Sequence, residues 1–161
     1  MSDTQTSKRG DRELVLTRTY DATPEQLYRA WTTPELLKPW FCPKPWTVVR
    51  ADMDVRPGGA SLVVMRGPDG NEFPNPGQYL ELVPNRRIVF TDAYVGGWQH
   101  APKPFMTVTL DFEPLPGGRT RYTAVAQHWS AEDCEAHEKM GFHQGWSIVA
   151  DQLAEELART R

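Results

Sequence analysis

The sequence predicts an α+β domain in which a curved antiparallel sheet of about seven strands surrounds one long C-terminal helix. Three observations predict this class. Strand-like runs separated by Gly/Pro turns fill residues 46–129, two short helix-start patterns follow the first strand-like run, and apolar residues recur at helical spacing towards the C-terminus. Because an antiparallel sheet needs one face covered, the C-terminal helix is expected to lie against it.

The chain is expected to begin with a tail. Residues 1–11 are polar and lack periodicity, which predicts a flexible segment ahead of a single domain at residues 12–161. Residues 13–20, with the sequence ELVLTRTY, are rich in strand-forming side chains and are followed by the turn-prone DATP. They predict the first strand.

Two short helices are predicted after this strand. Thr23 is a suitable N-cap, a proline follows it at the first helical position, and Gln26 completes a capping box. The pattern repeats with Thr33 as the cap and Pro34 at the first position. Pro39 is expected to end this second helix after little more than one turn.

Residues 46–129 predict the six remaining strands. The clearest hairpin signal is EPLPGG at residues 113–118, because the segments on both sides of it alternate between apolar and polar side chains. The residues expected to share the buried faces of these two strands are Met106, Val108, Leu110, Phe112, Tyr122, Ala124, Ala126 and His128.

The long helix is expected over about residues 131–158. Ser130 is its predicted N-cap, with Asp133 as capping-box partner. Gly141 and Gly145 weaken a helix interior, which suggests a close approach to the sheet, room for a ligand, or a bend. Alternatively, the helix starts near residue 141 and the preceding segment forms a separate turn. The apolar positions at helical spacing are Phe142, Trp146, Val149, Leu153 and Leu157.

Composition excludes several classes of function. The 161 residues carry a net charge of −3 without a basic stripe, which argues against nucleic-acid binding. No apolar run reaches the roughly 20 residues of a membrane span, and the polar start lacks a signal peptide, so a cytoplasmic protein is expected. Cys42 and Cys134 lie far apart and outside any nucleophile motif, which favours a structural role for both.

Metal and cofactor binding are not expected. With Trp146 taken to face the sheet, a regular helix places His143 at the edge of the buried stripe and His137 on the opposite face. The two histidines could then share a metal only if the helix broke at Gly141. Cys134 and His137 have helical spacing but lack further ligands nearby. Motifs for phosphate cradling, dinucleotide binding, a nucleophile elbow and zinc proteases are also missing.

A cavity is expected between the sheet and the helix. Small Ala124 and Ala126 would leave space in front of the helix, and His128 and His143 would flank it, either binding a ligand oxygen or lying hydrogen-bonded at the core margin. The same lining would also suit an ordinary core. The predicted ligand-binding residues are Trp40, Phe41, Met53, Met65, Tyr79, Phe90, Tyr94, Trp98, Ala124, His128, Met140, His143 and Trp146.

Two carboxylates are expected near this cavity. Glu81 and Asp92 lie on predicted strands, but no spacing signature marks either as an acid or a base. Salt bridges to Arg56, Arg86 or Arg87 are therefore the predicted use of both. No catalytic residue is assigned.

Four segments carry a resemblance to a known family. The chain resembles the START-like (SRPBCC) superfamily, which has the helix-grip fold, and within it the branch named after the activator of the heat-shock chaperone ATPase. The resemblance covers about residues 12–158. It implies a cavity, which in relatives takes lipids, sterols, polyketides or plant hormones. The segments are TRTYDATPEQLYRAWTTPELLKPWF, DVRPGG, RIVFTDAY and MGFHQGW.

Three functions are compatible with this resemblance. The leading hypothesis is binding of a small apolar or aromatic ligand, lipid-like or polyketide-like, in the cavity. An enzyme of the cyclase or dehydratase type would instead use His128, with Tyr94 or Tyr79, for proton transfer. A co-chaperone-like interaction module, with a protein partner or as a homodimer, is the third. The fold hosts all three, so the site has to discriminate between them.

Overall fold

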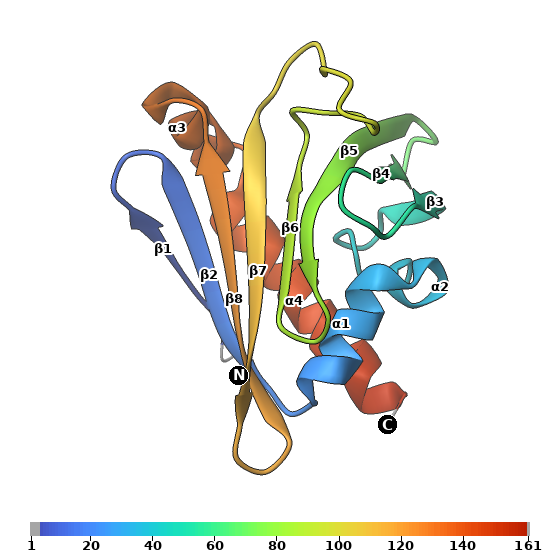
Figure 1. Cartoon of the computed structure of the whole chain (residues 1–161), viewed down its shortest axis with the longest axis vertical. Coiled ribbons are helices and arrows are strands. Elements are labelled where there is room, and N and C mark those ends of the chain that lie inside the picture. Colours follow the sequence, from blue (N-terminus) through green and yellow to red (C-terminus); the bar gives the residue numbers. More distant parts are fainter. Residues whose placement is uncertain (1–3, 161) are drawn as a thin grey trace.

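The computed structural model describes residues 4–160, which form one curved eight-stranded sheet with helices on its concave side (Figure 1). All pairings are antiparallel, in the order β1-β2-β8-β7-β6-β5-β4-β3. The predicted helix-grip fold is confirmed with one strand more than expected. The elements are β1 (Gln5–Arg9), β2 (Glu13–Tyr20), α1 (Pro24–Thr32), α2 (Pro34–Leu37), β3 (Thr47–Met53), β4 (Ala60–Arg66), β5 (Glu72–Val83), β6 (Arg87–Thr91), β7 (Met106–Leu115), β8 (Arg119–His128), α3 (Ala131–Lys139) and α4 (Phe142–Arg159).

The additional strand lies in the segment predicted to be a tail. Residues 5–9 pair with β2 from Gln5 opposite Thr17 to Arg9 opposite Glu13. Most of β1 is exposed, so its side chains carry no apolar alternation, and only the backbone pairing defines it. The tail prediction is therefore wrong for residues 5–9.

The hairpin of β7 and β8 forms as predicted. Val108, Leu110 and Phe112 on β7 are buried, and every second residue of β8 from Thr120 to His128 is buried as well. The glycine pair that follows Pro116 adopts positive φ, as a tight hairpin turn requires. These two strands lie next to each other in the middle of the sheet and contribute many of the buried side chains of the core.

The predicted capping of α1 is confirmed. The Gln26 backbone N–H donates to Thr23 Oγ1 at 3.2 Å, and the Thr23 N–H donates to Gln26 Oε1 at 2.8 Å. Thr33 occupies the N-cap position of α2, but its side chain makes no capping hydrogen bond. Helix α2 ends at Leu37, two residues before Pro39.

Strand β5 extends through a proline-containing segment at residues 74–76. Pro74 and Pro76 lie opposite Val64 and Leu62 of β4, whereas pairing with β6 begins only at Gln78. The first half of β5 therefore has one free edge, and prolines two residues apart can direct their missing N–H groups towards it. β5 changes partner at Gln78, and a register shift follows at Tyr79.

The predicted long helix is two helices. Ser130 caps α3 by accepting the Asp133 N–H at 3.1 Å, as expected. Gly141 has φ +102°, a left-handed conformation that favours glycine, and α4 starts immediately after it. A continuous helix over residues 131–158 is therefore wrong. The alternative is correct about a helix start near residue 141, but the segment before it is the helix α3 and not a turn. The bend explains Gly141.

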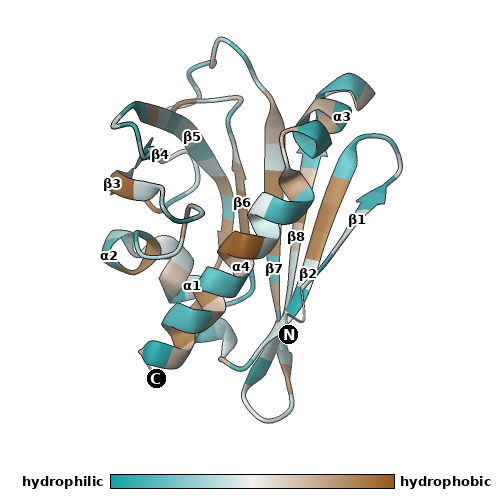
Figure 2. Cartoon of the chain, turned by 180° about the vertical axis from the view of Figure 1, so that it is seen from behind, coloured by the Kyte–Doolittle hydropathy of each residue, from teal (hydrophilic) through white to brown (hydrophobic). Residues whose placement is uncertain are grey.

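Helix α4 runs obliquely across the concave face of the sheet (Figure 2). Its predicted apolar stripe is confirmed at its ends, where Phe142, Leu153 and Leu157 are buried. Within residues 4–160, no helix is long and apolar enough to cross a membrane.

Candidate functional site

A cavity of about 720 Å³ separates α4 from the strands β4 to β8. Its volume lies within the range of small-molecule sites. The open end is bordered by the proline-containing half of β5, the β6–β7 loop at residues 101–103, and Met140. Met140, in the turn between α3 and α4, is 75% exposed. The cavity therefore reaches solvent between two loops and the free edge of β5.

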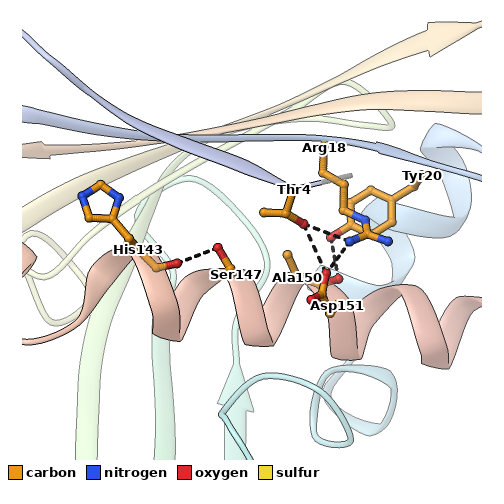
Figure 3. Close-up of polar contacts among 7 residues, drawn as sticks. All are labelled: Thr4, Arg18, Tyr20, His143, Ser147, Ala150 and Asp151. Atoms are coloured by element: carbon orange, nitrogen blue, oxygen red, sulfur yellow. Dashed lines mark hydrogen bonds and ion pairs between the residues drawn. The ribbon is translucent and has the colours of Figure 1, made fainter. Parts of the chain in front are cut away.

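Polar contacts hold α4 against strand β2 and the residue that precedes β1 (Figure 3). Arg18 of β2 forms an ion pair with Asp151 and donates to Thr4 Oγ1 at 2.9 Å. The Tyr20 hydroxyl donates to the Ala150 carbonyl at 3.0 Å, and Arg18 also lies over the Tyr20 ring at 4.9 Å. Because α4 is fixed on this side, curvature of the sheet leaves space on the other.

One wall of the cavity is an aromatic cluster. The Trp31 ring of α1 lies 4.9 Å from that of Trp40, 5.9 Å from that of Phe41 and 6.1 Å from that of Phe90. Tyr122 of β8 also borders the cavity. This wall offers flat apolar surface to a ligand.

Helix α4 supplies the facing wall through one side of its first three turns. Phe142, Trp146, Val149 and Leu153 border the cavity. Gly145 lies among them, and a Cβ built on it would meet no atom within 4 Å. The space for a ligand that a glycine within the helix suggested is therefore present at Gly145, on the side of α4 that borders the cavity.

A pair of histidines lies at the end of the cavity formed by α3. His128 Nδ1 is 3.0 Å from the Arg12 carbonyl oxygen, and His128 Nε2 is 2.8 Å from His137 Nδ1. Both rings are buried, but only His137 borders the cavity. The Phe105 ring lies against both, at 5.3 Å from His128 and 5.2 Å from His137.

Burial shifts the ionisation of the groups around the cavity. Desolvation, with smaller contributions from the positive forms of His128 and His143, lowers the pKa of His137 to about 4. Burial raises the pKa of Tyr79 to about 12, and it also raises the pKa of Tyr122 well above its usual value. At neutral pH these side chains are therefore uncharged, and they add polarity to the site without charge.

Six predicted ligand-binding residues border this cavity. Met53 and Tyr79 instead border a separate small cavity of about 40 Å³ beneath α1 and α2, which Phe90 and Phe41 also reach. The six that border the main cavity are Trp40, Phe41, Met65, Phe90, Met140 and Trp146.

The remaining predicted residues lie elsewhere. Tyr94 and Trp98 contact each other in the β6–β7 loop, with ring centroids 5.3 Å apart, and Trp98 is 55% exposed. Ala124 is completely buried between Leu110 and Leu16 in the sheet and borders neither cavity. His128 lies one layer behind the cavity wall.

His143 faces β1 and not the cavity. Its Nδ1 is 2.8 Å from Thr6 Oγ1, and its Nε2 is 2.8 Å from Glu138 Oε2. The other oxygen of that carboxylate, Oε1, lies 3.5 Å from Lys8 Nζ. Hydrogen bonding to His143 lowers the pKa of Glu138. The predicted orientation of His143 towards the cavity is wrong, because β1, the strand that His143 contacts, lies in the segment expected to be a tail.

His137 is the residue that the sequence analysis missed. It was placed on the outer face of a continuous helix, but the break at Gly141 separates the orientation of α3 from that of α4. The available signal was Gly141 itself, since a left-handed glycine commonly follows a helix end. Phe105, whose ring contacts both His128 and His137, lies in the β6–β7 loop directly before β7.

The two carboxylates differ in their partners. Glu81 pairs with Arg87 at 3.7 Å, as predicted. Asp92 borders the cavity, and its Oδ1 accepts the backbone N–H groups of Phe105 at 2.8 Å and Met106 at 3.0 Å. The predicted arginine pairing of Asp92 is therefore wrong, and this carboxylate fixes the loop that carries Phe105.

Metal ligands are not clustered in residues 4–160, where no group of three or more His, Cys, Asp or Glu side chains could hold an ion. Cys42 and Cys134 are free and buried. Burial raises the pKa of both thiols. Raised pKa values disfavour the thiolate form that a nucleophile or metal ligand needs.

The fold and cavity can be compared with known proteins. A family model described as Activator of Hsp90 ATPase homolog 1-like protein matches residues 21–158, which is most of the chain. The chain belongs to this family. The Activator of Hsp90 ATPase homolog 1-like family lies within the START-like superfamily, as the sequence resemblance implied. No curated protein matches the chain.

Several solved structures of bacterial proteins are similar to this chain. Protein NE0264 from Nitrosomonas europaea is 39% identical, with a TM-score of 0.90, and the match covers 94% of this chain and 97% of that one. Protein Ms6760 from Mycobacterium smegmatis is 26% identical, with a TM-score of 0.80 and 98% of both chains covered. A protein from Arthrobacter aurescens is 21% identical, covers 96% and 91%, and shows the same fold at a TM-score of 0.84.

Proposed function

We propose that this protein binds a small apolar or aromatic molecule in the cavity between α4 and the sheet. The observation that carries the proposal is the cavity itself, about 720 Å³ in volume and lined mainly by aromatic and aliphatic side chains. Membership of the START-like superfamily supports it, because related cavities take hydrophobic ligands. A lipid-like or polyketide-like skeleton fits this lining.

Binding is favoured over catalysis by the positions of the titratable groups. The cyclase or dehydratase hypothesis assigned proton transfer to His128 with Tyr94 or Tyr79. His128 lies behind the wall, Tyr94 lies in the β6–β7 loop, and Tyr79 borders only the smaller cavity. These three side chains do not meet around one bound molecule.

A chaperone-related role, which the description of the family suggests, has weaker support. Large exposed apolar side chains in residues 4–160 belong to several different elements, among them Leu36, Phe73, Trp129 and Ile148. These side chains therefore do not define one apolar face for a protein partner, whereas the cavity defines one site for a small molecule.

The test is to fill the cavity from α4. Gly145→Leu adds a side chain where a Cβ meets no atom, and it also replaces a weak helix former. We expect N-phenyl-1-naphthylamine to bind the native protein saturably, with increased fluorescence, and to lose most of its affinity for Gly145→Leu. The melting temperature of the variant should not fall.

Gln144→Leu is the matched control, because Gln144 is the exposed neighbour on the same helix and does not border the cavity. It should bind the probe as the native protein does. Absence of saturable binding to the native protein, or unchanged affinity in Gly145→Leu, would refute binding in this cavity.

A further inference from the structure

The histidine pair at the α3 end of the cavity has a defined direction of hydrogen bonding. A backbone carbonyl can only accept, so the Arg12 carbonyl, 3.0 Å from His128 Nδ1, requires the proton on that nitrogen. In the neutral ring, His128 Nε2 is then an acceptor. The 2.8 Å contact with His137 Nδ1 therefore requires that His137 Nδ1 carries a proton and donates.

These two hydrogen bonds leave His137 Nε2 unprotonated, with a free lone pair. In the neutral tautomer fixed by His128, the second ring nitrogen of His137 can accept a hydrogen bond but cannot donate one. His137 Nε2 makes no hydrogen bond within residues 4–160. It also differs from the fully enclosed side-chain nitrogens of that region that lack a partner, because it is not completely covered by protein atoms. Since His137 borders the cavity, this acceptor is accessible to a molecule inside it.

The surroundings of His137 are aromatic. Phe105 and Phe142 each lie 5.2 Å from its ring, and Trp146 lies 5.8 Å away. A hydrogen bond made here would be shielded from water, which strengthens it and penalises a ligand that leaves the acceptor unpaired. A negatively charged group at this position would face the lone pair of His137 Nε2 and would be buried among apolar side chains. Both effects disfavour binding of an anionic ligand.

We infer that the cavity selects ligands whose apolar or aromatic skeleton carries a hydroxyl group, and that this hydroxyl donates its hydrogen bond to His137 Nε2. The inference rests on the proposed binding function and adds the class of ligand, a phenol or an alcohol as opposed to an ether or a carboxylate. His128 acts as a positioning residue, because it fixes the tautomer of His137. The lowered pKa of His137 supports the assignment, since the ring stays neutral at pH 7.

Three probes of similar size separate these chemistries: 2-naphthol donates, 2-methoxynaphthalene does not, and 2-naphthoate is charged. Titration calorimetry at pH 7 should show 2-naphthol binding about three- to tenfold more tightly than 2-methoxynaphthalene, as one shielded neutral hydrogen bond provides. The naphthoate should bind more weakly than either. His137→Phe should abolish the preference for the naphthol while changing the affinity for the ether little.

Nitrogen NMR of the native protein avoids dependence on the folding of the variant. Addition of 2-naphthol should shift the resonance of the unprotonated His137 Nε2, whereas 2-methoxynaphthalene should leave it in place. Equal affinities of naphthol and ether, an unmoved resonance, or a preference that survives in His137→Phe would each overturn the inference. If N-phenyl-1-naphthylamine binds and none of the three probes does, the inference fails and the binding function stands. If no probe binds, both fail.

Discussion

At the scale of single residues, His137 links the site to the stability of the fold. Its pKa, lowered to about 4 by burial, means that the unfolded chain binds a proton more readily than the folded protein between pH 6.5 and pH 4. The free energy of unfolding should therefore decrease as the pH falls through this window. Between pH 7 and pH 5 the loss attributable to His137 is about 2 kcal/mol.

Urea unfolding at pH 7 and pH 5 measures this loss, and His137→Phe supplies the comparison. The variant has no imidazole at position 137, so its stability should change less over the same interval. The lowered pKa of Glu138 acts in the same direction but below pH 4.5, outside the interval. Equal pH dependence in both proteins would show that His137 is not protected from protonation.

At the scale of elements, the two glycines flanking the start of α4 have opposite roles. Gly141 has φ +102°, so Gly141→Ala should destabilise the protein by about 1–2 kcal/mol through left-handed strain. Gly145 is helical and has open space at its Cβ position, so Gly145→Ala should stabilise by about 0.5–1 kcal/mol. Thermal or urea unfolding of the pair compares the same chemical change four residues apart. Effects of the same sign would argue against the break between α3 and α4.

At the scale of the whole molecule, α4 is the element that closes the core. Leu153 and Leu157 are buried, and the Gln152 side chain donates to the carbonyls of Trp40 at 3.0 Å and Cys42 at 2.8 Å. A chain ending at Gly141 would lose these contacts and expose the concave face of the sheet. It should unfold without a cooperative transition, as calorimetry would detect.

A chain ending at Arg159 is the control, because it retains every residue of α4. It should melt like the full chain. A sharp transition in the chain ending at Gly141, with an unfolding enthalpy close to that of the full protein, would show that the sheet folds without its covering helix.

The sequence by itself determined the elements whose own residues carry a pattern. Alternation along β7 and β8, the capping box at Thr23 and Gln26, and the apolar spacing from Phe142 to Leu157 each report burial within one continuous segment. Such patterns predicted the fold class and the cavity-lining residues Met65, Phe90 and Trp146. They could not reveal β1, because an exposed edge strand has no buried face.

Only the tertiary structure decided where the cavity lies and which histidine faces it. The cavity exists because α4 is held against β2 by contacts such as Tyr20 to Ala150, while β5 changes partner at Gln78. His137 enters the wall because a left-handed Gly141 turns α3 relative to α4, and His128 then fixes its tautomer across a 2.8 Å hydrogen bond. Periodicity within a segment carries no information on such contacts, because curvature of the sheet and the anchoring of α4 depend on residues far apart in the chain.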